Sequence, residues 1–197
     1  MATEKYLNKY RIASARLQNW DYRSRGAYFI TICTANREHY FGEIENGKMK
    51  LSNLGVIADI FWHEIPARKP FIKLGEYVIM PNHIHGILIV GDHDNQYPQQ
   101  QPQQQCHLQQ FPTVNNTPPL KNETMSKKSP KPNSISTIIR SYKSAVTKHA
   151  NRLGIANGWQ TRFHDHIIRD DASCDRISNY IKNNPANWKD DRFHKKL

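Results

Sequence analysis

The sequence contains little cysteine and no long hydrophobic run. Its three cysteines, Cys33, Cys106 and Cys174, lie far apart and show none of the paired spacings of a disulfide framework or a zinc knuckle. No stretch approaches the roughly 18 apolar residues of a membrane span, and residues 1–7 contain no hydrophobic signal core. We therefore expect a soluble, cytoplasmic protein that has no membrane partner.

Acidic residues are scarce as well. The 197 residues include 28 lysines and arginines against 17 aspartates and glutamates, which gives a formal net charge of +11. Such an excess favours a polyanionic partner, and nucleic acid is a better candidate than an anionic membrane surface. Tyrosines and tryptophans lie among the basic residues, and aromatic rings can stack on unpaired bases. Any single lysine near a chain end can equally be a solvated surface residue.

The composition changes sharply in residues 94–132, where glutamine and proline are frequent. So polar and proline-rich a stretch cannot bury itself, and we expect a disordered insertion there. The rest of the chain divides into a basic N-terminal segment (1–25), one folded domain (26–93 and 133–188) and a basic tail (189–197). This length suits a single domain with a sizeable core.

Hydrophobic periodicity predicts an α+β domain, because strand patterns alternate with helical patterns. The expected strands are residues 26–34, 72–80, 82–90 and 164–169, with a short hairpin over 40–44 and 48–51. The expected helices are residues 52–64, ended by Pro66, a segment from 135 capped by Ser134, and a segment from about 171 that stops before Pro185. The order βαββαβ, followed by a terminal helix, is typical of the ferredoxin-like (RRM-like) sandwich with an antiparallel sheet.

Two histidines, His83 and His85, stand at the head of the apolar run that covers residues 82–90. Side chains alternate across a strand, so both imidazoles leave the same face while Ile84 points to the other. Imidazole is a good ligand for divalent metals. The competing interpretation is a pair of structural core histidines, although burying two imidazoles without partners would cost on the order of 2 kcal/mol or more.

The terminal helix carries Tyr180 and Asn184, which lie four residues apart and therefore on one helical face. A tyrosine is a poor nucleophile near neutral pH, since the phenol pKa is about 10. A divalent metal that polarises a phosphate makes the attack feasible, so the pair predicts phosphate-ester cleavage. The alternatives are that Tyr180 is a packed core residue, or that Tyr142, on another basic helix, is the nucleophile.

The run Met-Pro-Asn-His-Ile-His at residues 80–85 resembles the HUH signature of single-tyrosine transposases, in which U is a hydrophobic residue. Residues 158–169 and 180–185, the latter reading Tyr-Ile-Lys-Asn-Asn-Pro, resemble downstream blocks of the branch called REP-associated tyrosine transposases. Residues 11–17 and 26–31 resemble the opening block of the same branch. The resemblance covers most of the chain except the insertion.

This resemblance implies a ferredoxin-like HUH fold with a C-terminal catalytic helix that cuts single-stranded or hairpin DNA and holds the cleaved end as a 5′-phosphotyrosine. It also implies that Tyr180 is the nucleophile and that His83, His85 and Asn184 bind Mg²⁺ or Mn²⁺. The protein would act in DNA transposition as a monomer or a homodimer. The residues expected to contact DNA are Arg11, Arg16, Arg23, Arg25, Arg140 and Lys143.

Two other functions remain open from the sequence. A domesticated, non-catalytic protein that binds hairpin DNA would keep the fold and the charge but need neither metal nor Tyr180. A metal-dependent hydrolase would use His83, His85 and either His164 or His166 with a water nucleophile, and would form no covalent adduct.

Overall fold

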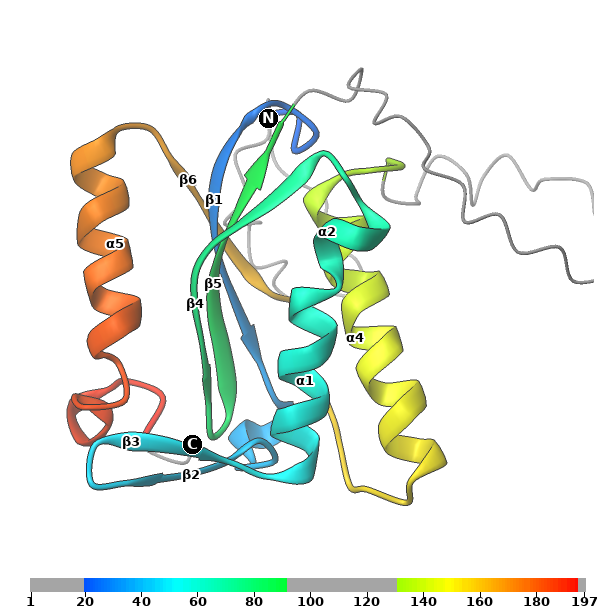
Figure 1. The fold of residues 1–197 in the computed structure, drawn as a ribbon, viewed down its shortest axis with the longest axis vertical. Coiled ribbons are helices and arrows are strands. Elements are labelled where there is room, and N and C mark those ends of the chain that lie inside the picture. Colours follow the sequence, from blue (N-terminus) through cyan, green and yellow to red (C-terminus); the bar gives the residue numbers. More distant parts are fainter. Residues whose placement is uncertain (1–19, 92–130, 195–197) are drawn as a thin grey trace, which may run out of the picture.

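The centre of the protein is a four-stranded antiparallel sheet, seen in a computed structural model that describes residues 20–91 and 131–194 (Figure 1). Its strands are β1 (Gly26–Cys33), β4 (Ile72–Met80), β5 (His83–Val90) and β6 (His164–Ile168), in the spatial order β4-β5-β1-β6. Each neighbouring pair is antiparallel. All four agree to within one residue with the strands expected from the sequence.

Helices cover both faces of this sheet. The helices α1 (Asn53–His63) and α4 (Ile135–Arg152) pack on one face, while α5 (Asp171–Asn183) crosses the other face (Figure 1). The order of strands and helices, with the central pair β5 and β1, confirms the expected ferredoxin-like α+β sandwich. Within the residues that the structure describes, the helices are too short or too polar for any of them to span a lipid bilayer.

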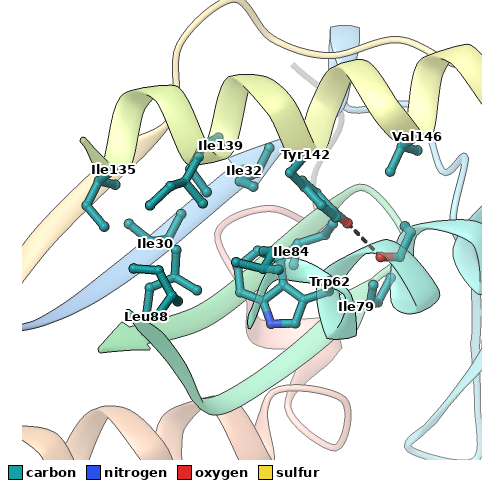
Figure 2. Close-up of a cluster of buried hydrophobic side chains, with 14 of the residues drawn as sticks. Ile30, Ile32, Trp62, Ile79, Ile84, Leu88, Ile135, Ile139, Tyr142 and Val146 are labelled. Carbon is teal, nitrogen blue, oxygen red and sulfur yellow. Dashed lines mark hydrogen bonds between the residues drawn. The ribbon is translucent and has the colours of Figure 1, made fainter. Parts of the chain in front are cut away.

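The two faces of the sheet have different residues because side chains alternate along each strand. Ile30 and Ile32 of β1 point toward α1 and α4 (Figure 2), and with Tyr28 they join the main hydrophobic core. On β5, Ile84 and Leu88 belong to the same core. His83, His85 and Ile87 alternate with them and therefore face α5. The main core thus holds the strands rigid from behind the histidine pair.

Local sequence explains where the elements on the α1 side begin and end. Ser52 caps α1 by accepting a hydrogen bond from the Gly55 backbone N–H at 3.1 Å. Pro66 does more than end this helix, because it lies in the first turn of the short helix α2 (Ile65–Arg68), where its missing N–H is not needed. The expected hairpin is present as β2 (Gly42–Glu45) and β3 (Lys48–Leu51). Asn46 and Gly47 both take positive φ at its turn, as type I′ geometry requires.

At Gly86 the backbone of β5 lies close against Trp62 of α1. A Cβ atom at this position would overlap the indole ring of Trp62, which is completely buried. We expect Gly86→Ala to lower the free energy of unfolding by about 1–3 kcal/mol, because a well-packed core does not accommodate an extra methyl group. Urea denaturation followed by circular dichroism measures this loss. In a Trp62→Phe background, where the ring is smaller, Gly86→Ala should lower the free energy of unfolding by less. If the two substitutions lowered it additively, the explanation by overlap with Trp62 would be contradicted.

Some segments defined from the sequence fall outside the described residues. Nearly all of the predicted insertion and residues 1–19 of the basic N-terminal segment are among them. The predicted basic tail is described as far as residue 194; it begins within the short helix η3 (Trp188–Asp190) and continues beside the end of the sheet that carries His83. Trp188 and Phe193 are buried there, next to Cys33 and Met80. This stretch therefore contributes to the surroundings of the histidine pair.

Candidate active site

His83 is held by its neighbour in the chain. Its Nδ1 lies 2.9 Å from Asn82 Oδ1. The Asn82 amide is oriented by its nitrogen, which donates to the carbonyls of Phe193 at 2.8 Å and Arg37 at 3.3 Å. The amide oxygen must therefore face His83, and Nδ1 must carry the imidazole proton. The Nε2 lone pair is left available, and this nitrogen is buried without a hydrogen-bond partner.

The ring of His83 stays neutral. Burial, aided by the positive charges of Arg192 and Arg37, lowers its pKa to about 3, against the smaller opposite effect of the Asn184 amide. The pKa of His85 is also lowered, chiefly by burial and then by His83. Both imidazoles are thus in the unprotonated form that binds metals.

His85 is fixed from two sides. Its Nδ1 lies 2.9 Å from the hydroxyl of Thr31, on the neighbouring strand β1, and its Nε2 lies 3.1 Å from the Tyr180 hydroxyl. The register of the sheet explains the first contact, because Thr31 and His85 are paired directly across β1 and β5. The two histidine rings are 4.4 Å apart between centroids. A partner on the second ring nitrogen is the usual way in which proteins orient a metal-binding histidine.

Tyr180 comes from α5, which begins where Asp170 accepts a hydrogen bond from the Ser173 backbone N–H at 2.7 Å. The buried Ile181 fixes the helix against Ile87 and Ile168 of the sheet. The Tyr180 residue is 42% exposed, while its hydroxyl lies beside His85. Burial of part of the ring and the charge of Asp191 raise the pKa of Tyr180 to about 12. The phenol is therefore protonated at neutral pH.

Asn184 follows one helical turn after Tyr180 and is only 1% exposed. Its Nδ2 donates to Asp191 Oδ2 at 2.8 Å, while its Oδ1 is buried without a hydrogen-bond partner. The Asn184 side chain also lies against His83, whose pKa it raises. Two buried acceptor atoms, Asn184 Oδ1 and His83 Nε2, thus lie close together, and neither receives a hydrogen bond.

Asp191 is the site residue that the sequence interpretation missed. Its Oδ2 accepts hydrogen bonds from Tyr180 at 3.2 Å and from Asn184, and its Oδ1 accepts from the Phe193 backbone N–H at 2.7 Å. One ligand atom each from His83, His85 and Asp191 lie within 4.8 Å of one another. The available signal was an acidic pair, Asp190 and Asp191, within an otherwise basic C-terminal stretch.

A divalent cation fits this donor set. Two neutral imidazole nitrogens, a carboxylate and an orphaned amide oxygen are ligands that Mn²⁺ and Mg²⁺ accept, and a cation would satisfy the two acceptors that now have no hydrogen. The hydrogen bonds of Asn82 to His83 and of Thr31 to His85 already hold both rings. His83, His85, Asn184 and Asp191 are therefore the residues that could hold a metal.

Other residues considered from the sequence do not belong to this ligand set. Tyr142 points into the main core, where its hydroxyl donates to the Ala58 carbonyl at 2.9 Å (Figure 2). Burial raises its pKa well above the usual value, and no phosphate could reach it. His164 and His166 are exposed on β6. Among residues 20–91 and 131–194, the metal-ligand cluster includes neither of them.

The residues expected to contact DNA are spread over the molecule. Arg11 and Arg16 lie outside the described residues, whereas Arg23 and Arg25 precede β1, at the end of the sheet remote from His83. Arg23 is bound to Asp21, with 2.6 Å between Nη2 and Oδ2. Arg140 is exposed on α4. Lys143 is half-buried and donates to the Gln160 carbonyl at 2.7 Å, and burial lowers its pKa to about 8.

The molecule is thus a ferredoxin-like protein in which a His-x-His strand faces a tyrosine helix. A REP-associated tyrosine transposase, solved bound to a REP hairpin, has a similar fold: the TM-score is 0.54 at 16% identity, with 88% of this chain and 74% of that chain covered. The fold implied by the resemblance is thereby confirmed. A candidate transposase of Deinococcus radiodurans fits more loosely, with a TM-score of 0.40 at 12% identity over 85% of this chain and 95% of the other, and adds no argument.

Sequence comparison finds a relative that covers most of the chain. No family model matches the chain. An uncharacterized protein of Haemophilus influenzae is 36% identical over 182 residues, which are 92% of either chain. The chain therefore belongs to the same family as this protein.

Proposed function

We propose that this protein is a metal-dependent single-stranded DNA endonuclease and strand transferase that acts through a 5′-phosphotyrosine at hairpin or palindromic repeat DNA. The observation that carries the proposal is the meeting of Tyr180 with the buried histidine pair, 3.1 Å from His85 Nε2. The pair of orphaned acceptors on His83 and Asn184 supports the metal requirement. The solved REP-associated transposase with a similar fold is bound to a REP hairpin, which supports hairpin DNA as the substrate.

The chemistry assigned to Tyr180 is a transesterification. Its hydroxyl oxygen forms a bond to the phosphorus of the DNA backbone, and the bond between that phosphorus and the 3′ oxygen breaks. The phenolic proton passes toward solvent through Asp191, which already accepts the Tyr180 hydrogen bond. The 3′ oxygen takes up a proton from solvent and leaves as a hydroxyl. The same 3′ hydroxyl, or that of another strand, can attack the phosphotyrosine and so reverse the reaction.

The surrounding residues prepare the phosphate for this attack. A Mg²⁺ or Mn²⁺ ion on His83, His85, Asn184 and Asp191 would polarise the phosphate oxygens and stabilise the phenolate. Arg37 and Arg192, whose charges already lower the pKa of His83, would attract the phosphate. α5 sets the direction of attack, and Lys182 on this helix is joined to Glu76 of β4 at 3.1 Å.

The direct test is a covalent-capture experiment. We expect the protein, incubated with Mn²⁺ or Mg²⁺ and hairpin DNA from the flanks of its own gene, to give a protein–DNA band on a denaturing gel. Nuclease digestion and peptide mass spectrometry should then locate the nucleotide on Tyr180. Tight, salt-sensitive binding without a band would indicate the non-catalytic DNA-binding protein. Cleavage without a band would indicate the hydrolase with a water nucleophile.

A further inference from the structure

A groove lies on the helical side of the sheet, away from Tyr180. Its volume is about 570 Å³. Phe61 of α1 and Ala145 of α4 line its apolar part, and Arg68 of α2 and His149 of α4 lie against the Phe61 ring. The remaining lining residues are Arg140, Ser141, Ser144 and Lys148, all exposed on α4. Among the residues that the structure describes, those that line the groove include no aspartate or glutamate.

The charge of α4 is unusually one-sided. Over 18 residues this helix carries Arg140, Lys143, Lys148 and Arg152 and not one acidic residue. Surface helices commonly balance their charges with acidic partners three or four positions away. Of the basic lining residues, Arg68 is paired with a carboxylate, that of Glu64 on the turn after α1, at 2.7 Å. Arg140 and Lys148 therefore present positive charge that no residue of their own helix offsets.

The spacing of these two residues matches a double-stranded ligand. Arg140 and Lys148 are eight positions apart, which is about 12 Å along a helix. The major groove of B-DNA has a similar width of about 12 Å, so each side chain can reach a phosphate on a different strand. The hydroxyls of Ser141 and Ser144 lie between them and can donate to phosphate oxygens, and their small size lets a backbone come close.

We infer that this groove binds the sugar-phosphate backbone of duplex DNA, as in the stem of a hairpin. The inference depends on the proposed function for its ligand, DNA, but not for the reaction, since the groove and Tyr180 lie on opposite sides of the sheet. In such a protein, the groove would provide affinity for the hairpin stem, and the opposite side of the sheet would cleave the reacting strand.

Binding in EDTA tests the inference without cleavage. A hairpin and a single strand of equal length are titrated, over a series of salt concentrations, with the wild type and with the Arg140→Ala/Lys148→Ala double variant. We expect the double variant to bind the hairpin about tenfold more weakly or worse, and its salt slope to fall by about 1.8, since each phosphate contact contributes about 0.9. Affinity for the single strand should change by less than threefold, a difference of about 0.6 kcal/mol.

The matched control is Lys48→Ala/Lys50→Ala on the β2–β3 hairpin. Both lysines are exposed, and their removal lowers the net charge by the same two units. Lys50 is already paired with Glu45 at 2.9 Å. We expect this control to keep the hairpin affinity and the salt slope. Equal losses in both double variants, an unchanged Arg140→Ala/Lys148→Ala variant, or an equal loss on the single strand would each overturn the inference.

Discussion

Tyr180→Phe should form no covalent adduct with hairpin DNA, and strand cleavage should fall by about 10⁴-fold or more, as for other enzymes that lose their nucleophile. The variant lacks the hydroxyl that lies beside His85 and Asp191, while its ring can still pack at its present distance of 6.3 Å from Phe29. A denaturing gel with labelled DNA measures both quantities. DNA affinity should stay close to that of the wild type, because the change removes no positive charge.

Tyr142→Phe is the control on the other side of the sheet. We expect it to form the adduct at the wild-type rate, because the Tyr142 hydroxyl is buried on the Ala58 carbonyl. Its effect should appear in stability instead, as a loss of about 1 kcal/mol in the free energy of unfolding for a buried hydrogen bond. An adduct that survives in Tyr180→Phe but disappears in Tyr142→Phe would refute the assignment of the nucleophile.

Removal of a histidine ligand should have the second large effect. We expect His83→Ala and His85→Ala each to weaken Mn²⁺ binding by more than about 100-fold, since even the loss of a residue that only orients a ligand costs about 10–100-fold. The reason is that both histidines belong to the ligand cluster with Asp191, and that the unpaired Nε2 of His83 is buried near the unpaired Oδ1 of Asn184. Titration calorimetry measures the affinity directly. Thermal unfolding gives a second readout, because Mn²⁺ at about 100 times its Kd should stabilise the wild type by about 2.7 kcal/mol.

Two further variants make this test specific. Thr31→Ala should lose affinity by about 10–100-fold, because the hydroxyl that orients His85 is then missing. His166→Ala should bind Mn²⁺ like the wild type, since that histidine is exposed on β6 and is no member of the cluster. The metal site would be contradicted if the wild type gave no heat of binding with Mn²⁺ and its unfolding temperature did not rise. Loss of binding in His166→Ala would favour the hydrolase.

Much of the fold follows from local sequence patterns. Strands such as residues 72–80 and helices such as α5 were predicted because side-chain burial repeats with a period of two or of 3.6. The helix predicted to stop at Pro66 does stop there, but the short helix that follows was not predicted, because a proline that ends one helix can also occupy the first turn of the next. The burial of Tyr142 had a local signal, since it lies four residues from both Ile138 and Val146, which are core residues of the same helix.

The site itself could be predicted only in parts. The shared face of His83 and His85 is a local property of a strand, and that of Tyr180 and Asn184 is a local property of a helix. The meeting of the two pairs depends on how α5 packs across the sheet, and no sequence spacing gives it. Asp191 lies further along the chain, directly after the short helix η3, and reaches the site because this helix turns the chain back toward Asn184. Long-range contacts of this kind have no local pattern.

The two ends of the segment between β5 and α4 are fixed at the same corner of the fold. Gly91 donates its backbone N–H to the Phe71 carbonyl at 2.7 Å, and Lys69 donates to the Asn133 side chain at 2.9 Å. Gly91 is eight residues from His83, which is about 27 Å along a strand. The chain therefore leaves and re-enters the described part of the fold far from the candidate metal ligands. A change in the number of residues between Gly91 and Lys131 should leave the geometry around the histidines unaltered.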